Sequence, residues 1–235
     1  MYRLNQFIAK SGVCSRRAAE ELILSGEISV NGEVVQELSK RVDYKDLVKY
    51  KNKVLKIQRY KYILLNKPKG YITTVSDERK RLTVMSLIKG ACHERLFPVG
   101  RLDRDTMGLL LFTNDGNLTQ KITHPKYGIK KVYHVRLDQK IQSDHLEKIK
   151  SGITLEDGPI KVDKITVLNA LGSELGIEIH SGRNRIIRRI FLFFNYNVVK
   201  LDRVLLGSLT KRNLKRGTWR TLTESEVNIL KMNKN

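Results

Sequence analysis

Residues 100–116 read GRLDRDTMGLLLFTNDG, a polar loop that runs directly into an apolar strand and ends in an Asn-Asp-Gly turn. The apolar run at 109–113 predicts a buried strand, and the glycines on either side predict turns. A strand fixes the backbone next to such a loop while the loop itself stays exposed. The charged side chains at 101–105 are therefore expected at the edge of a cleft, where rigidly held groups suit catalysis.

Two carboxylates of this loop, Asp103 and Asp105, both adjoin Arg104. A metal-binding pair would need further His, Asp or Glu ligands, and no compact cluster of these residues lies nearby in the sequence. A general acid and base pair of the glycosidase type fits as well, although the sequence does not fix the separation of the carboxylates. The aspartates are also suited to capping turns and pairing with Arg101 and Arg104. The loop alone leaves these three interpretations open.

The rest of the chain after residue 62 mixes short helical and strand patterns without strict βαβ alternation, which favours an α+β fold with a mainly antiparallel sheet. Asn66–Gly70 has the proline and glycine of a turn between two strands. Lys67, in this turn, is expected to contact phosphate. Helices are predicted at 83–89, 117–123, 143–151 and 186–195, and strands at 63–65, 71–74, 109–113, 131–137, 161–168, 175–180 and 197–202.

Residues 1–57 are predicted to form a small α/β domain of their own. Ser15 is placed to cap a helix over residues 16–25, and Gly26 to end it. Asn31-Gly32, between alternating apolar residues, predicts a tight hairpin. Polar residues 58–62 are predicted to link this domain to a larger one at 63–235.

The charge indicates a polyanionic partner. The chain has 45 Lys and Arg against 24 Asp and Glu, a net charge of +21, and residues 181–235 alone hold 13 basic and 3 acidic side chains. Nucleic acid is the usual partner of such an excess. Four guanidiniums lie within seven residues, at Arg183, Arg185, Arg188 and Arg189. We expect phosphate opposite them.

Several classes of protein are disfavoured. No window approaches the ~20 apolar residues that span a bilayer, and the first residues lack the apolar core of a signal peptide. The two cysteines form no CxxC pair, so we expect no metal site and a reducing, cytoplasmic location. Glycine-rich dinucleotide and P-loop motifs are absent, which weakens the dehydrogenase, methyltransferase and NTPase interpretations.

Residues 3–35, RLNQFIAKSGVCSRRAAEELILSGEISVNGEVV, resemble an S4 RNA-binding domain. Basic side chains flank the start of its second helix, where free amides and the helix dipole also attract phosphate. The resemblance implies RNA contacts from the residues Arg3, Lys10, Ser15, Arg16 and Arg17.

Residues 100–116, GRLDRDTMGLLLFTNDG, closely resemble the catalytic motif of bacterial ribosomal RNA pseudouridine synthases, in the branch that has an S4 domain. LLNKPKGYITT at 64–74, HPKYGIKKVYHV at 124–135 and IEIHSGRNRIIRRIF at 177–191 match the same branch in order. The resemblance implies that Asp103 is the essential aspartate, Tyr133 the active-site tyrosine and Arg188 the arginine that pairs with the aspartate. One departure is Ile186, where the third motif usually has Gln or Glu.

This chemistry needs no cofactor, because breaking the N1–C1′ bond of uridine and forming a C5–C1′ bond changes neither redox state nor composition. The target nucleotide must be extruded from folded RNA, which has a free-energy cost of about a few kcal/mol. Arg101, Arg183, Arg185 and Arg189 are expected to offset that cost by contacting the backbone.

The expected partner is ribosomal RNA, most like the 23S RNA of the large-subunit synthase B group, either free or in an assembling subunit. The chain is expected to act as a monomer, with no membrane and no small-molecule cofactor. Three alternatives remain: a synthase for 16S RNA, a non-catalytic RNA-binding assembly protein, and a DNA-binding regulator. The last lacks a convincing helix-turn-helix pair.

Overall fold

The computed structural model describes residues 1–232, which divide into two compact units. The first comprises Met1–Tyr60 with His93–Leu96, and the second comprises Lys61–Cys92 with the chain from Phe97 onward. Residues 58–60 thus lie in the first unit, and Tyr62 begins a strand of the second. No sequence pattern indicates that residues 93–96 join the first unit. The domain limits at 57 and 63 stay predictions.

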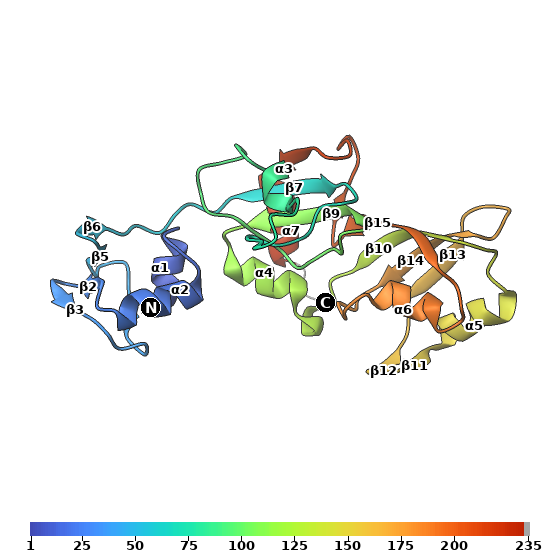
Figure 1. The fold of residues 1–235 in the computed structure, drawn as a ribbon, viewed down its shortest axis with the longest axis horizontal. Coiled ribbons are helices and arrows are strands. Elements are labelled where there is room, and N and C mark those ends of the chain that lie inside the picture. Colours follow the sequence, from blue (N-terminus) through green and yellow to red (C-terminus); the bar gives the residue numbers. More distant parts are fainter. Residues whose placement is uncertain (233–235) are drawn as a thin grey trace. The chain divides into compact units, whose positions relative to one another are not determined.

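The first unit, blue in Figure 1, has two helices beside small sheets. Its apolar core joins both helices to the strands through buried residues such as Leu4, Ile23 and Val48. The four-stranded sheet has the order β3-β2-β5-β6, and β1 pairs with β4. The elements are β1 Tyr2–Arg3, α1 Leu4–Lys10, α2 Arg16–Leu24, β2 Ile28–Val30, β3 Glu33–Val34, β4 Arg41–Val42, β5 Val48–Tyr50 and β6 Lys53–Val54.

The predicted start of α2 is confirmed, because the Ser15 hydroxyl accepts a hydrogen bond from the Ala18 amide at 3.1 Å. Gly26 follows the helix with φ +73°, a conformation that side chains disfavour. The predicted hairpin is also confirmed, because β2 and β3 pair antiparallel around Asn31 and Gly32, both with positive φ.

Within residues 1–232, the second unit has one sheet of nine strands whose main path is β13-β14-β10-β15-β9-β7-β17. Among the described strands of this sheet, only β9 and β15 pair in parallel, so the predicted α+β fold with a mainly antiparallel sheet is confirmed. The strands are β7 Tyr62–Lys67, β8 Phe97–Pro98, β9 Thr106–Thr113, β10 Lys131–Leu137, β13 Lys164–Val167, β14 Glu174–Ile179, β15 Val198–Leu206, β16 Leu209–Thr210 and β17 Trp219–Thr221.

Two apolar cores lie along this sheet, and Figure 1 shows different helices beside its two halves. One core packs α5 and α6 against β10, β13 and β14. The other packs α4 and α7 against β7 and β9. The remaining elements are α3 Val84–Leu87, α4 Gly116–Thr123, a 3₁₀ turn Pro125–Tyr127, α5 Ser143–Ser151, β11 Ile153–Leu155, β12 Gly158–Ile160, α6 Ile186–Leu192 and α7 Glu224–Met232. None of the helices between residues 1 and 232 is long and apolar enough to cross a membrane.

One predicted element is wrong: residues 71–74 do not form a strand beside β7. They make a single bridge, from Ile72 to Thr83, because both edges of β7 are already occupied by β9 and β17. The sequence also gave no signal for the β11–β12 hairpin or for β17, which pairs with β7 from more than 150 residues away.

Candidate active site

The loop that contains Asp103 lies between β8 and β9 and is held by the segment that follows β7. Lys67, at the end of β7, donates hydrogen bonds to the carbonyl oxygens of Asp103 (3.1 Å), Arg104 (3.2 Å) and Thr106 (2.8 Å). The Thr73 hydroxyl donates to the Leu102 carbonyl at 2.6 Å. The loop backbone is therefore fixed from several sides, as a catalytic loop requires.

The prediction that Lys67 contacts RNA is wrong. The side chain is 0 % exposed, and its ammonium also donates to the Pro68 carbonyl at 3.1 Å. Burial lowers the pKa of Lys67 to about 8, although Asp103 and Asp105 oppose this shift. Lys67 therefore serves as an internal clamp for the loop.

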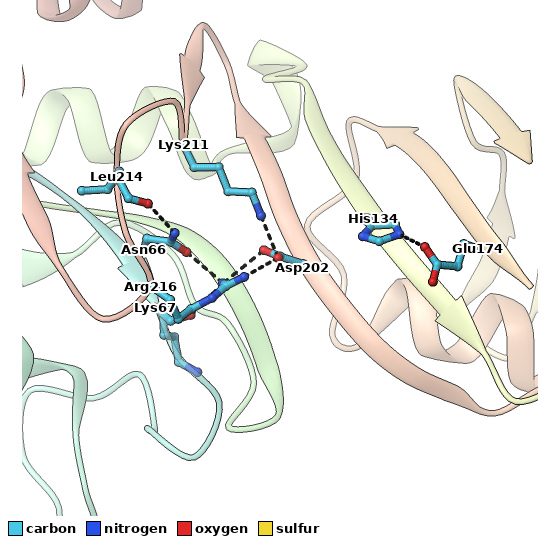
Figure 2. Close-up of polar contacts among 8 residues, drawn as sticks. All are labelled: Asn66, Lys67, His134, Glu174, Asp202, Lys211, Leu214 and Arg216. Carbon is cyan, nitrogen blue, oxygen red and sulfur yellow. Dashed lines mark hydrogen bonds and ion pairs between the residues drawn. The ribbon is translucent and has the colours of Figure 1, made fainter. Parts of the chain in front are cut away.

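A charge network around the buried Asp202 supports the same region (Figure 2). Asp202 on β15 accepts hydrogen bonds from Lys211 at 2.7 Å and Arg216 at 2.5 Å, and Arg216 also donates to the Asn66 side chain at 2.8 Å. Burial would raise the pKa of Asp202, but the two cations outweigh it and lower the pKa below its usual value. The network ties β15 and residues 211–216 to Asn66, the neighbour of Lys67.

Gly108, on β9, permits the close approach of β9 and β15. Its φ is +106°, and a Cβ atom built there would lie 2.2 Å from the Arg203 carbonyl oxygen. A side chain can therefore be accommodated only if the two parallel strands separate.

We expect Gly108→Ala to lower the free energy of unfolding by about 1–3 kcal/mol or more, because it combines an unfavourable φ with a backbone clash. Chemical denaturation measures this change. Gly182→Ala is the control, because nothing lies within 4 Å of a Cβ atom built at this glycine of the same unit. Equal stability of the two variants would contradict the prediction.

The carboxylate of Asp103 faces two guanidiniums. Its Oδ2 atom lies 3.6 Å from Arg185 Nη1 and 3.9 Å from Arg188 Nε. Arg188 Nε is buried without a hydrogen-bond partner, while its Nη1 donates to the Val198 carbonyl at 2.8 Å. Burial and the neighbouring Arg185 lower the pKa of Arg188. The Asp103 side chain is 29 % exposed, so its carboxylate faces both cations while it stays open to solvent.

Arg185 has a left-handed backbone, with φ +46°, at the start of α6. Such a conformation is strained in a non-glycine residue and is often found at functional sites. It turns the chain so that Arg185 and Arg188 both reach Asp103.

A pocket of about 150 Å³ opens beside this ion pair. Four predicted site residues line it together with Asp103: Tyr133, Arg101, Arg183 and Arg185. Its apolar walls include Ile186 and Leu201. Ile186 is buried in the core, so the apolar residue that departs from the usual motif fills a wall of the pocket.

Arg183 and Arg189 meet the β11–β12 turn. Arg189 forms two hydrogen bonds with the Asp157 carboxylate, at 2.9 and 2.6 Å, and Arg183 lies 3.6 Å from the same group. The hydrogen bonds from Arg189 lower the pKa of Asp157. Arg189 does not line the pocket, so any contact with RNA must compete with Asp157.

In the first unit, Arg16 and Arg17 are exposed in the first turn of α2, which Ser15 caps. Arg3 is exposed just before α1. Lys10 is half-buried, and its ammonium donates to the Tyr60 hydroxyl at 2.7 Å. Arg3, Arg16 and Arg17 thus have the exposure that a phosphate contact needs.

Two charged residues of the pocket were not predicted, Lys131 and Arg203. Lys131 lies two positions before Tyr133 on a predicted strand, and residues two apart share a face, which is a signal that could have revealed it. Arg203 follows the predicted strand 197–202, where a lone arginine beside an apolar run was a weaker signal. Among the described residues, no group of three or more His, Cys, Asp or Glu side chains could hold a metal ion.

Comparisons with known proteins agree with this arrangement. Residues 61–192 match the family model of RNA pseudouridylate synthases, and residues 3–48 match that of the S4 domain. An uncharacterised RNA pseudouridine synthase of Aquifex aeolicus is 42 % identical over 231 residues, which cover 96 % of this chain and 92 % of that protein.

The ribosomal large subunit pseudouridine synthase B of Bacillus subtilis is 40 % identical, over 98 % of this chain and 96 % of its own length. A crystal structure of a pseudouridylate synthase superposes with a TM-score of 0.71 at 30 % identity, covering 98 % of this chain and 100 % of that one. The chain therefore belongs to the RNA pseudouridine synthase family, whose members convert uridine in RNA to pseudouridine, and it carries an S4 domain before the synthase domain.

Proposed function

We propose that this enzyme isomerises a specific uridine in ribosomal RNA of the large subunit, with Asp103 as the catalytic carboxylate. The observation that carries the proposal is the Asp103 carboxylate, paired with Arg185 and Arg188 at a pocket that Tyr133 also lines. The choice of large-subunit RNA is supported by the similarity to the Bacillus subtilis protein over nearly the whole chain.

The isomerisation breaks the N1–C1′ bond, joins C5 to C1′, and moves a proton from C5 to N1. An ionised carboxylate beside the ribose can act as a nucleophile or as a base. The guanidiniums of Arg185 and Arg188 lie 3.6 and 3.9 Å from Asp103 Oδ2 and hold this carboxylate at the pocket. Tyr133 offers a flat face to the extruded base, and its phenol can accept or donate a proton near C5.

The exposed arginines of α2 would hold neighbouring RNA by its phosphates. We expect the double variant Arg16→Ala with Arg17→Ala to weaken RNA binding and to reduce the salt slope by about 1–2, because each lost phosphate contact releases fewer counterions. Binding measured at several salt concentrations gives both values. Lys53→Ala is the control, because Lys53 is exposed on the small sheet of the same unit. An unchanged slope in the double variant would exclude α2 as a phosphate-binding element.

Mapping of pseudouridines in ribosomal RNA from cells with and without the protein tests the substrate. The proposal expects one site, or a few, to disappear from large-subunit RNA. Loss of a site in small-subunit RNA would favour the alternative substrate instead. A map unchanged in both RNAs would reject ribosomal RNA as the substrate.

A further inference from the structure

Two cations lie in the pocket wall with almost no exposure to solvent. Lys131 on β10 is 8 % exposed and Arg203 on β15 is 4 % exposed, and both line the pocket beside Asp103 and Tyr133. They are close enough for Arg203 to lower the pKa of Lys131 further, to about 8, after the larger effect of burial.

Both side chains keep hydrogen-bond donors unused. Lys131 Nζ donates to the carbonyls of Ile129 at 3.0 Å and His180 at 3.2 Å, which leaves one of its three hydrogens. Arg203 Nε donates to the Leu109 carbonyl at 2.8 Å, and its buried Nη2 has no hydrogen-bond partner.

Neither cation has a carboxylate partner within residues 1–232, although other charged groups share the pocket. A buried cation without a counter-charge is unfavourable, and a buried donor without an acceptor is too. Lys131 and Arg203 therefore have positive charge and unused donors available for an acceptor that the chain itself does not supply. The other charged or titratable side chains that line the pocket are Asp103, Arg101, Tyr133, Arg183 and Arg185.

We propose that Lys131 and Arg203 bind the carbonyl oxygens of the extruded uracil and stabilise the negative charge that the base acquires when it leaves the ribose. This inference rests on the proposed function. It adds Lys131 and Arg203 to the charged groups that act in the reaction, besides Asp103 and the two arginines that face it. Fixed donors in a dry site stabilise developing charge strongly, because they need no reorganisation during the reaction.

The charge arises from the bond change itself. When the N1–C1′ bond breaks, its electron pair stays with uracil and is delocalised over N1 and the two carbonyl oxygens. The base then attacks C1′ through C5, the C5 proton leaves to a base, and N1 gains a proton, so that atoms and electrons balance. Hydrogen-bond donors at the two carbonyl oxygens stabilise the detached uracil most, after the N1–C1′ bond breaks and before the C5–C1′ bond forms.

The same donors give base selectivity. Uracil presents acceptors at O2 and O4, whereas cytosine presents an amino group in place of O4. The amino group of cytosine is a donor and cannot accept a hydrogen bond from Lys131 or Arg203. The buried donors would then stay unpaired, which lowers the affinity for cytosine. The pocket should therefore favour uracil over cytosine before any chemistry takes place.

The test uses the full chain and large-subunit ribosomal RNA transcribed with tritium at C5 of uracil, because isomerisation releases this tritium to water. We expect Lys131→Met to slow single-turnover release by about 100-fold, the usual effect of losing one fixed donor, while RNA affinity stays within a few-fold. Lys131→Arg, which keeps the cation, should recover most of the rate. Arg203→Met and Arg203→Lys form a second pair with the same expectation.

A purely structural role of Lys131 is separated by a binding measurement. In the Asp103→Asn background, the RNA fragment around the modified uridine is compared with the same fragment carrying cytidine there. The chain with Lys131 should prefer uridine, and Lys131→Met should lose about tenfold of this preference. Turnover of Lys131→Met at the wild-type rate, or an unchanged preference in that variant, would overturn the inference. A wild-type chain that releases no tritium would instead reject the proposed function.

Discussion

Asp103→Asn is expected to lower pseudouridine formation by about 10⁴-fold or more, the scale seen when a catalytic side chain is removed. The amide keeps the size of the carboxylate but cannot act as a nucleophile or a base. RNA affinity should stay within a few-fold, because the substitution removes a negative charge that repels phosphate. Tritium release and filter binding on the same RNA measure the two effects.

Asp105→Asn is the matched control for this prediction. Asp105 is exposed two residues away on the same loop, and no hydrogen bond or ion pair ties its carboxylate to another described residue. We expect this variant to retain most of its activity. Substantial turnover by Asp103→Asn, or equal losses in both variants, would remove Asp103 from its proposed role.

Much of the fold follows from local pattern. The strand after the 100–105 loop, the capped helix α2 and the hairpin at Asn31-Gly32 all have signals within a few residues of themselves. The strand expected at 71–74 fails because its neighbour β7 pairs with β17, which is distant in the sequence. Local propensity cannot reveal a competitor for a sheet edge, since the competition is decided by tertiary packing.

The site likewise combines residues that the sequence indicates with contacts that only the folded chain reveals. Resemblance pointed to Asp103 and Arg188, and the structure places their charged groups 3.9 Å apart. It places Lys67 quite differently from the expectation, because a lysine in a Pro-Gly turn looks exposed in the sequence. Only the folded chain shows that the carbonyls of a loop about 40 residues away surround its ammonium. Buried polar residues are paired through such contacts, which leave no periodic pattern in the sequence.

Lys67→Met is the second change with a large expected effect. The methionine fills similar space but leaves the carbonyls of Asp103, Arg104 and Thr106 without this donor. We expect single-turnover activity to fall by about 100-fold, because a displacement of ~1 Å in a catalytic group has an effect of this size. RNA affinity should change little, since Lys67 is buried. Lys69→Met, at an exposed position of the same turn, is the matched control.

The pH dependence of stability separates the clamp from a simple packing role. Burial lowers the pKa of Lys67 from 10.5 to about 8, so between these values the unfolded chain binds more protons than the folded chain. The free energy of unfolding contributed by Lys67 therefore rises with pH across this window, and it is constant below it. Above a pH of about 8 the Lys67 amine is neutral and has only two hydrogens for its four carbonyl acceptors. The catalytic loop is then held less firmly, although the protein as a whole is more stable. Because Lys131 has a similarly lowered pKa, both proteins should become more stable as pH rises, and Lys67→Met should lack only the part of the rise that Lys67 contributes. An equal rise in both proteins would show that folding does not lower the pKa of Lys67.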